Sequence, residues 1–180
     1  MEAHLDELDH LIDTSLTYAR FEREAPEPHF SSVRFAAWLN DEVDAVRLLG
    51  RDLAITVDTE KLPENLHVDL DRKAMPYALR NLLRNAFKYA SKQVVVSAEL
   101  DQDRILIHVD DDGIGIPPED REHVFSAFTR LDRSRDRATG GYGLGLAITR
   151  RVLELHGGTA TADAAPLGGA RFTLSWKAQQ

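Results

Sequence analysis

The sequence has no cysteine, no long apolar run and no excess of positive charge. Without cysteine among its 180 residues, a disulfide framework, a thiolate metal site and a thiol nucleophile are all excluded. No stretch of about 18 apolar residues is present, and the chain does not open with a basic segment followed by an apolar one. We therefore expect a soluble protein without a secretory signal or a membrane span of its own.

The charge balance limits the kinds of partner. Twenty-two lysines and arginines against 30 aspartates and glutamates give a net charge of −8, and the resulting field repels nucleic acid and anionic lipid. No nucleic-acid partner is expected, and a phosphate-bearing ligand has to be captured by local positive groups. The length of 180 residues suits one domain with a modest addition.

Hydrophobic periodicity predicts a chain that mixes helices and strands. Apolar residues recur at helical spacing in some segments and at every second position in others. The expected helices cover residues 2–24, 34–49, 71–90, 118–128 and 144–156, and the expected strands cover 53–57, 66–70, 94–100, 104–109, 159–161 and 171–176. This order predicts an α/β sandwich in which helices cover one face of a mixed sheet.

The first helix is separated from the rest by prolines. Pro26 and Pro28 end it, because proline lacks an amide donor and restricts the residue before it. We therefore place a domain boundary after residue 25. Its apolar positions lie at helical spacings and are Leu5, Leu8, Ile12 and Ala19. The helix either packs on its own domain or forms one arm of a helical bundle whose other arms lie outside this chain.

Two of the chain's four asparagines lie four residues apart in the middle of an expected helix. Asn81, Asn85, Lys88 and Tyr89 fall within an arc of about 100°, opposite the apolar positions of the same helix. Amide oxygens suit Mg²⁺, which keeps several waters and phosphate oxygens, and an ammonium group attracts phosphate. A solvated helix face with a chance asparagine pair is the alternative.

An acidic and glycine-rich segment directly follows the strand expected at 104–109. It reads Asp-Asp-Asp-Gly-Ile-Gly-Ile-Pro over residues 110–117 and lacks the ligand layout of a calcium-binding loop. A tight hairpin is the alternative, but the next segment is helix-like and is not a returning strand. Glycines beside a fixed carboxylate let a ligand approach closely, and that carboxylate accepts a hydrogen bond from the exocyclic amine of adenine.

The third cluster, residues 140–145, contains four of the 11 glycines and comes immediately before an expected helix. Successive amides that lead into a helix N-terminus form an anion-binding nest. The spacing matches neither the P-loop nor the dinucleotide-binding motif, and a flexible linker is the alternative. Four arginines precede the cluster and supply local positive charge: Arg130, Arg133, Arg135 and Arg137.

In this order the clusters resemble the nucleotide-binding boxes of the histidine kinase ATPase domain, whose Bergerat-type fold is shared in outline with gyrase B, Hsp90 and MutL. Residues 81–89 resemble the N box, 111–115 the first glycine box, 125–130 the F box and 141–146 the second glycine box. The resemblance runs from about residue 30 to the C-terminus. It implies an α+β two-layer sandwich with a mixed, mostly antiparallel sheet, preceded here by a single N-terminal helix.

The resemblance implies binding of ATP with Mg²⁺. Asn85 would be the metal ligand, and Asn81, Lys88 and Arg130 would act on the phosphates as catalytic residues. Asp111 would bind the adenine amino group.

Further nucleotide contacts are implied for Tyr89, beside the ring, and for the glycine boxes. The glycine-box residues are Gly113, Gly115, Gly141, Gly143, Leu144, Gly145 and Leu146. Between Arg130 and Gly143 the resemblance implies a mobile lid. Phe125 and Phe128 are expected to anchor this lid to the core and not to touch the nucleotide.

The sequence departs from the family in lacking a phosphoacceptor. That histidine is followed by an acidic residue, but none of the seven histidines here is. Residues 1–25 resemble the second helix of the dimerisation domain, and residues 26–180 resemble the ATP-binding catalytic domain. The implied protein is the cytoplasmic kinase core of an inner-membrane sensor, which phosphorylates a histidine on a dimerisation domain outside this chain and serves a response regulator.

Two other functions stay open at this point. An ATPase clamp of the gyrase or MutL branch uses a glutamate in the N box to activate water, and this chain has Asn81 there. A nucleotide-binding pseudokinase module would keep the binding residues without transferring phosphate.

Overall fold

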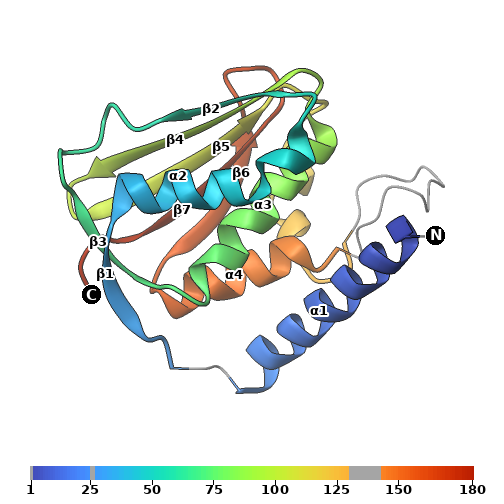
Figure 1. The fold of residues 1–180 in the computed structure, drawn as a ribbon, viewed down its shortest axis with the longest axis horizontal. Helices are drawn as coiled ribbons and strands as arrows, with labels where there is room; N and C mark the ends of the chain where they lie inside the picture. Colours follow the sequence, from blue (N-terminus) through green and yellow to red (C-terminus); the bar gives the residue numbers. More distant parts are fainter. Residues whose placement is uncertain (1, 25–26, 130–142) are drawn as a thin grey trace.

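The computed structural model describes residues 2–24, 27–129 and 143–180, arranged as helices over two sheets (Figure 1). The helices are α1 (Glu2–Glu24), α2 (Phe35–Val46), α3 (Met75–Tyr89) and α4 (Gly145–Leu155), with short 3-10 helices η1 (Arg47–Gly50), η2 (Pro118–Asp120) and η3 (His123–Phe125). The strands are β1 (Phe30–Arg34), β2 (Ala54–Asp58), β3 (His67–Asp71), β4 (Gln93–Asp101), β5 (Arg104–Asp111), β6 (Thr159–Ala164) and β7 (Ala170–Lys177).

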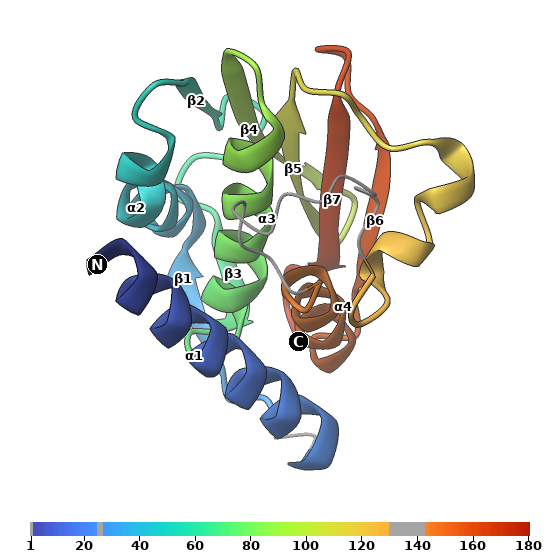
Figure 2. The same cartoon turned by 90° about the vertical axis from the view of Figure 1, so that its right-hand side faces the viewer.

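The main sheet has five strands in the order β2-β4-β5-β7-β6. Strand β2 runs parallel to β4, and the other neighbours are antiparallel. Helices α2, α3 and α4 lie on one side of this sheet (Figure 2). Every second residue of the central strands is buried against them, including Val94, Val96, Ile105, Ile107 and Val109. The predicted sandwich, with its mixed and mostly antiparallel sheet, is confirmed.

Helix α3 begins four residues later than predicted because Asp71 still belongs to a strand. Asp71 is the last residue of β3, and its Oδ1 atom accepts hydrogen bonds from the backbone amides of Lys73 (2.8 Å) and Ala74 (3.0 Å). This turn directs the chain into the helix, where Pro76 occupies the first turn and loses no hydrogen bond there.

The helix predicted over 118–128 is wrong. The segment contains the two single-turn helices η2 and η3, and Ser126 and Phe128 leave the helical region, with Phe128 at a φ of 64°. Arg121, between the two turns, is held by tertiary contacts: its guanidinium donates to the carbonyl of Ile116 (3.3 Å) and to the carboxylate of Asp163 (2.7 Å). The second contact joins this segment to β6.

Strand β1 was not predicted from the sequence. It pairs antiparallel with β3 in a separate two-stranded sheet, in which Val33 lies opposite Val68. The small sheet is linked to the end of β7, because the amide of Asp69 donates to the carbonyl of Ala178 (2.7 Å) and the indole of Trp176 donates to the carbonyl of Asp69 (3.1 Å). Strand β1 has five residues of mixed polarity and no alternating pattern that would predict it, and it is a strand because it pairs with β3.

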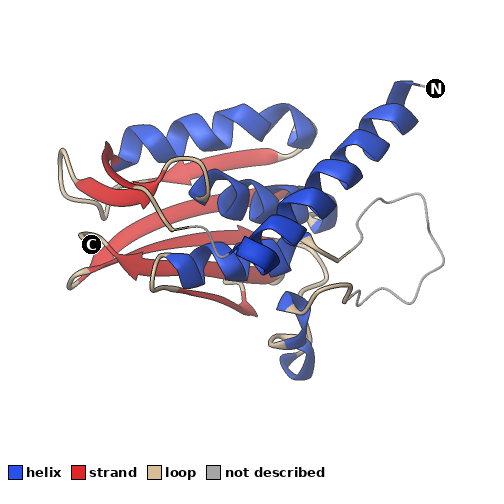
Figure 3. Ribbon diagram, turned by 90° about the horizontal axis from the view of Figure 1, so that it is seen from below, coloured by secondary structure: helices blue, strands red, loops and turns tan. Residues whose placement is uncertain are grey.

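Helix α1 packs on the domain with a different face from the predicted apolar stripe. Thr17 and Phe21 are buried, and Arg151 of α4 donates to the carboxylate of Glu22 at 2.8 Å. Leu8 and Ile12 of the predicted stripe stay about half exposed, at 55% and 49%. Figure 3 shows α1 crossing the helical layer, with its N-terminal end projecting outward. The helix thus contacts its own domain and still presents a second, apolar face.

A buried histidine joins the small sheet to α4. The Nδ1–H of His156 donates to the carbonyl of Val152 (2.7 Å), so its Nε2 accepts the hydrogen bond from the backbone amide of Asp71 (3.0 Å). Burial lowers the pKa of His156, although its contact with Val152 and the charge of Asp71 oppose the shift. Both ring nitrogens are therefore satisfied only in the neutral ring.

Acidification is expected to weaken the fold through His156. Because its folded pKa is lowered, the unfolded chain binds the proton first, and the free energy of unfolding falls as the pH drops below about 6.5. The slope contributed by this group is at most about 1.4 kcal/mol per pH unit. Urea unfolding between pH 7 and 5 measures it. The slope should be smaller in His156→Gln and unchanged in the control His123→Gln, which alters an exposed ring; equal slopes in all three proteins contradict this assignment.

Candidate functional site

Helix α3 separates the core from a cavity. Its buried side consists of Met75, Ala78, Leu79, Leu82, Leu83 and Ala86. Its other side contributes Asn81, Asn85, Lys88 and Tyr89 to the wall of a cavity of about 510 Å³. The polar face predicted from the asparagine spacing therefore borders a cavity, which a simply solvated helix face does not explain.

The three sequence clusters border this same cavity. Ten of the predicted site residues line it: Asn81, Asn85, Lys88, Tyr89, Asp111, Gly115, Gly143, Leu144, Gly145 and Leu146. Gly113 does not line the cavity but adjoins it through Asp111. Arg130 and Gly141, together with most of the predicted lid, lie outside the described residues.

The three consecutive aspartates at the end of β5 have three different environments, because neighbouring residues of a strand point to opposite faces. Asp110 points away from the helices and forms two hydrogen bonds of 2.7 Å with the guanidinium of Arg171 on the paired strand β7. Asp111 points to the helical side and the cavity. Asp112 accepts hydrogen bonds from the backbone amides of Ser91 (2.8 Å) and Lys92 (3.1 Å), which fixes the chain after α3.

Asp111 provides a buried acceptor at the bottom of the cavity. Its side chain is almost fully buried, with 1% of its surface exposed. Oδ1 accepts hydrogen bonds from the backbone amides of Gly113 (2.9 Å) and Ala170 (3.2 Å). Burial raises the pKa of Asp111, and the charges of Asp112 and Asp110 add to the rise, while the two amides oppose it. The hydrogen bonds from described residues all reach Oδ1, which leaves Oδ2 for a ligand.

Two glycines make room for this carboxylate. A Cβ atom on Gly169 would lie 2.3 Å from Oδ1 of Asp111, and one on Gly113 would lie 2.2 Å from the carbonyl oxygen of Tyr89. Neither clash can be relieved by rotating a flexible side chain, because both involve backbone or a fixed carboxylate. Gly113 was a predicted site residue, whereas Gly169 was assigned only to the fold.

The N-terminus of α4 supplies backbone donors to the opposite wall. Among the described residues no side chain caps this helix at Leu144, and Leu144, Gly145 and Leu146 line the cavity. Thr149 ties α4 to α3, because its hydroxyl is within hydrogen-bond distance of the carbonyls of Ala78 and Gly145 (3.1 Å each). Uncapped amides with the positive end of the helix dipole form a site suited to phosphate.

Asn81 stands beside this helix end. A Cβ atom on Gly145 would lie 3.5 Å from the amide group of Asn81, so the two helices nearly touch there. The Nδ2 atom of Asn81 is buried, and among the described residues it has no hydrogen-bond acceptor. A buried donor without an acceptor costs about 1–3 kcal/mol, so this atom is best satisfied by a ligand in the cavity.

The two phenylalanines of the F box behave differently. Phe125 is buried, packs edge-on against Phe172 with 6.0 Å between ring centroids, and is covered by Arg150, so it belongs to the core; the lid that it is expected to anchor lies outside the described residues. Phe128, in contrast, does not pack in the core. Phe128 is 70% exposed and its ring lies 6.4 Å from that of Tyr18 on α1. Neither ring lines the cavity.

Several wall residues were missed by the sequence reasoning. His10, Leu11 and Thr14 of α1 close one side of the cavity, although the sequence placed α1 in another domain. Arg84 also lines it, three residues after Asn81 on the same helix, a spacing that the search for asparagines overlooked. The apolar wall includes Ile116, Val124 and Phe172, whose positions depend on tertiary packing.

Two features are absent from the described residues. No group of three or more histidines, aspartates or glutamates there could hold a metal ion by itself. In the same part of the chain, no helix has the length and apolar character needed to traverse a bilayer.

Sequence comparison identifies similar proteins. A family model for histidine kinase-, DNA gyrase B- and HSP90-like ATPases matches residues 70–180. Sensor protein RstB of Escherichia coli is 42% identical over 172 residues, which cover 96% of this chain and 39% of RstB. The sensor-like histidine kinase SenX3 of Mycobacterium tuberculosis is 38% identical over 150 residues, which cover 82% of this chain and 36% of SenX3. The chain spans less than two fifths of the length of these curated relatives.

Solved structures show the same fold. Full-length ShkA in complex with AMPPNP matches with a TM-score of 0.82 at 26% identity, over 95% of this chain and 36% of ShkA. The mycobacterial sensor histidine kinase MprB matches with a TM-score of 0.70 at 27% identity, over 84% of this chain and 99% of the MprB chain.

Gly169 is expected to be essential for the shape of the site. In Gly169→Ala the new methyl group overlaps the carboxylate of Asp111, and we expect a loss of about 1–3 kcal/mol in the free energy of unfolding, as for other overpacked positions. Urea denaturation measures this loss. Gly145→Ala is the control, because its methyl group meets Asn81 at an ordinary 3.5 Å; equal stability of the two variants would contradict the tight fit at Gly169.

Proposed function

This chain belongs to the family of histidine kinase-, DNA gyrase B- and HSP90-like ATPases, and we propose that it is the ATP-binding catalytic part of a sensor histidine kinase. In this proposal the cavity binds ATP with Mg²⁺, and the γ-phosphoryl group passes to a histidine on a dimerisation domain outside this chain. The phosphorylated histidine then serves a response regulator. The observation that supports the proposal best is the convergence of the three sequence clusters on one cavity.

Recognition of adenine is assigned to Asp111. Its free Oδ2 atom accepts a hydrogen bond from the exocyclic amine, while the carbonyl oxygen of guanine in the same place would be repelled. Tyr89 lies beside the ring, and apolar neighbours such as Ile116 and Phe172 line the same space. Since water is excluded from a buried carboxylate, this single hydrogen bond discriminates between purines more strongly than an exposed one.

The phosphates and Mg²⁺ are assigned to the other end of the cavity. The amide oxygen of Asn85 fits Mg²⁺, which binds through one or two protein oxygens and takes its other ligands from phosphate and water. When bound, Mg²⁺ would neutralise charge on the phosphate oxygens. Lys88 and the N-terminal amides of α4 attract the same oxygens, and Arg130 and Gly141 join this set as predicted contacts.

The catalytic contribution of this chain is positioning and neutralisation of charge. Phosphoryl transfer has a loose transition state, so a protein accelerates it mainly by holding the terminal phosphate in line with the nucleophile. The nucleophile is a neutral imidazole, and the adjacent acidic residue accepts its proton. Residues 1–25 are assigned to the end of the second helix of that dimerisation domain and residues 26–180 to the ATP-binding domain, on the cytoplasmic side of an inner-membrane sensor.

Water activation is less well supported than transfer to a histidine. An ATPase clamp needs a carboxylate that removes a proton from water, and at the corresponding position the neutral amide of Asn81 cannot act as a general base. A pseudokinase would bind nucleotide without transfer, and only a transfer assay separates it from a kinase.

Asp111→Asn tests adenine recognition. We expect ATP affinity to fall about tenfold to hundredfold, because Oδ1 stays bound to the backbone amides and the new amide donor meets the adenine amine. Isothermal titration with ATP and GTP measures the loss. In the parent, ATP affinity should also fall as the pH is lowered. Because the pKa of Asp111 is raised, its carboxylate takes up a proton at a higher pH than an ordinary aspartate does, so the loss of affinity should begin at that higher pH. The midpoint of thermal unfolding should not decrease, which separates lost binding from lost folding.

A transfer assay tests the reaction itself. Incubated alone with γ-labelled ATP and Mg²⁺, the chain should not label itself, because it lacks the acceptor histidine. Added dimerisation domain should be labelled slowly by the parent and not by Asn85→Ala. Stable label on a histidine of this chain overturns the assignment of the acceptor, and absence of transfer despite tight ATP binding favours the pseudokinase.

A further inference from the structure

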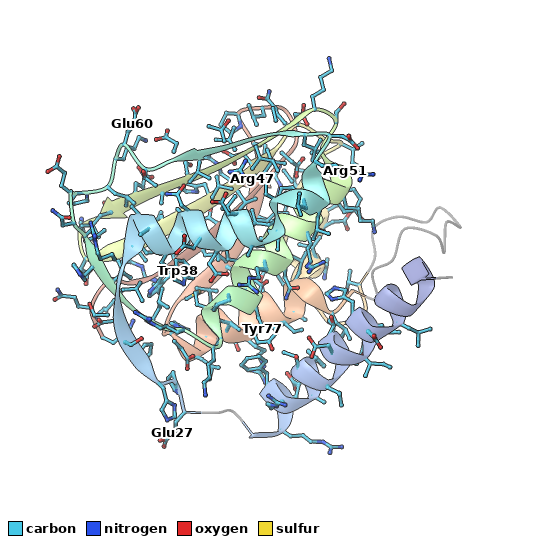
Figure 4. The ribbon with its side chains drawn as sticks, in the orientation of Figure 1. Glu27, Trp38, Arg47, Arg51, Glu60 and Tyr77 are labelled. Carbon is cyan, nitrogen blue, oxygen red and sulfur yellow. The ribbon has the colours of Figure 1, made fainter. Side chains whose placement is uncertain are left out.

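A second cavity adjoins the first between α1 and α3. It has a volume of about 430 Å³, and four residues line both cavities: His10, Thr14, Asn81 and Arg84. Figure 4 shows Tyr77, another residue of its wall, on the side of α3 that faces α1. The two cavities therefore meet beside the buried Nδ2 atom of Asn81.

The second cavity is positively charged although the chain as a whole carries a net charge of −8. Four of its wall residues are basic, Arg72, Lys73, Arg80 and Arg84, and two are acidic, Asp13 and Glu42. The carboxylate of Glu42 is already engaged, because its Oε2 atom accepts from Nε of Arg80 at 2.7 Å. Local positive charge thus remains where the cavities meet.

Arg84 is the basic residue at this junction. Among the side chains that the structure describes, those of residues 8–23, 27–129 and 143–180, none forms an ion pair with Arg84. Burial lowers the pKa of Arg84, and repulsion from Arg80 one turn earlier adds to the shift. An anion at the junction would relieve this repulsion and would accept a hydrogen bond from the guanidinium.

The position of Arg84 along α3 indicates which phosphate it meets. Tyr89, assigned to adenine, is eight residues from Asn81, or about 12 Å along the helix axis. The ribose and the inner phosphates fill this interval beside Asn85. Arg84 lies within this interval, next to Asn85, but it lines both cavities whereas Asp111 lines only the first, so Arg84 borders the side of the cavity away from the adenine acceptor.

We propose that the guanidinium of Arg84 and Nδ2 of Asn81 together bind the terminal phosphate of ATP, so that Arg84 determines the preference of this chain for ATP over ADP. The inference rests on the proposed function, because it assumes that the cavity holds ATP. The inference extends the proposed function because Arg84 was not among the phosphate-binding residues predicted from the sequence motifs. Arg84 contacts the terminal phosphate of ATP, and ADP, which lacks this phosphate, does not form the contact.

Isothermal titration with ATP and with ADP, each with Mg²⁺, tests this inference. Measurements at one low ionic strength limit screening of the partly exposed guanidinium. Arg84→Met should weaken ATP binding about tenfold and change ADP binding less than twofold. Arg84→Lys should restore part of the ATP affinity. The matched control is Arg72→Met, which removes the same charge from the second cavity away from the junction and should change neither affinity.

The outcomes separate this inference from the proposed function. Equal weakening of ATP and ADP in Arg84→Met, or unchanged binding of both, overturns the role of Arg84 and leaves the nucleotide site in place. If the parent chain binds neither nucleotide, the proposed function fails and this inference fails with it. If Arg84→Met loses affinity for ATP alone, while its ADP affinity and its midpoint of thermal unfolding are unchanged, the inference about Arg84 is supported.

Discussion

The site depends on the burial of one carboxylate among backbone atoms. Asp111 is enclosed so closely that a methyl group on Gly169 would overlap it, and Gly113 lets the same loop pass against the carbonyl of Tyr89. The two amide donors to Oδ1 offset part of the cost of burying the charge and set the direction of the other oxygen. Strand β5, the end of α3 and the turn before β7 must therefore meet in one arrangement.

The rest of the cavity follows from how α3 is placed over the sheet. One side of this helix is apolar and packs in the core, which leaves Asn81 and Asn85 on the opposite side. The uncapped start of α4 is held against them by the hydroxyl of Thr149. In the proposed function, the acceptor for the purine lies at the end of β5 and the phosphate-binding groups lie on α3 and α4, and precise positioning for phosphoryl transfer requires such placement on regular elements.

Helix α1 contributes to the walls of both cavities. Its residues His10 and Thr14 line both cavities, and its exposed leucines and isoleucine leave a second face for other contacts. In the proposed kinase this helix belongs to the dimerisation domain. Any movement of α1 would therefore change the wall that the two cavities share.

Local patterns in the sequence determined the central elements and most of the candidate site, because alternation in β4 and β5 and the two faces of α3 are properties of neighbouring residues. Tertiary structure decided what depends on distant partners. Strand β1 pairs with β3, the two short turns of residues 118–125 replace the predicted helix and are joined to β6 through Arg121 and Asp163, and Phe128 lies against Tyr18. The roles of Gly169, Arg84 and α1 in the cavity walls also depend on distant partners. Each role arises from contact with another segment of the chain, and the spacing of neighbouring residues does not predict such contacts.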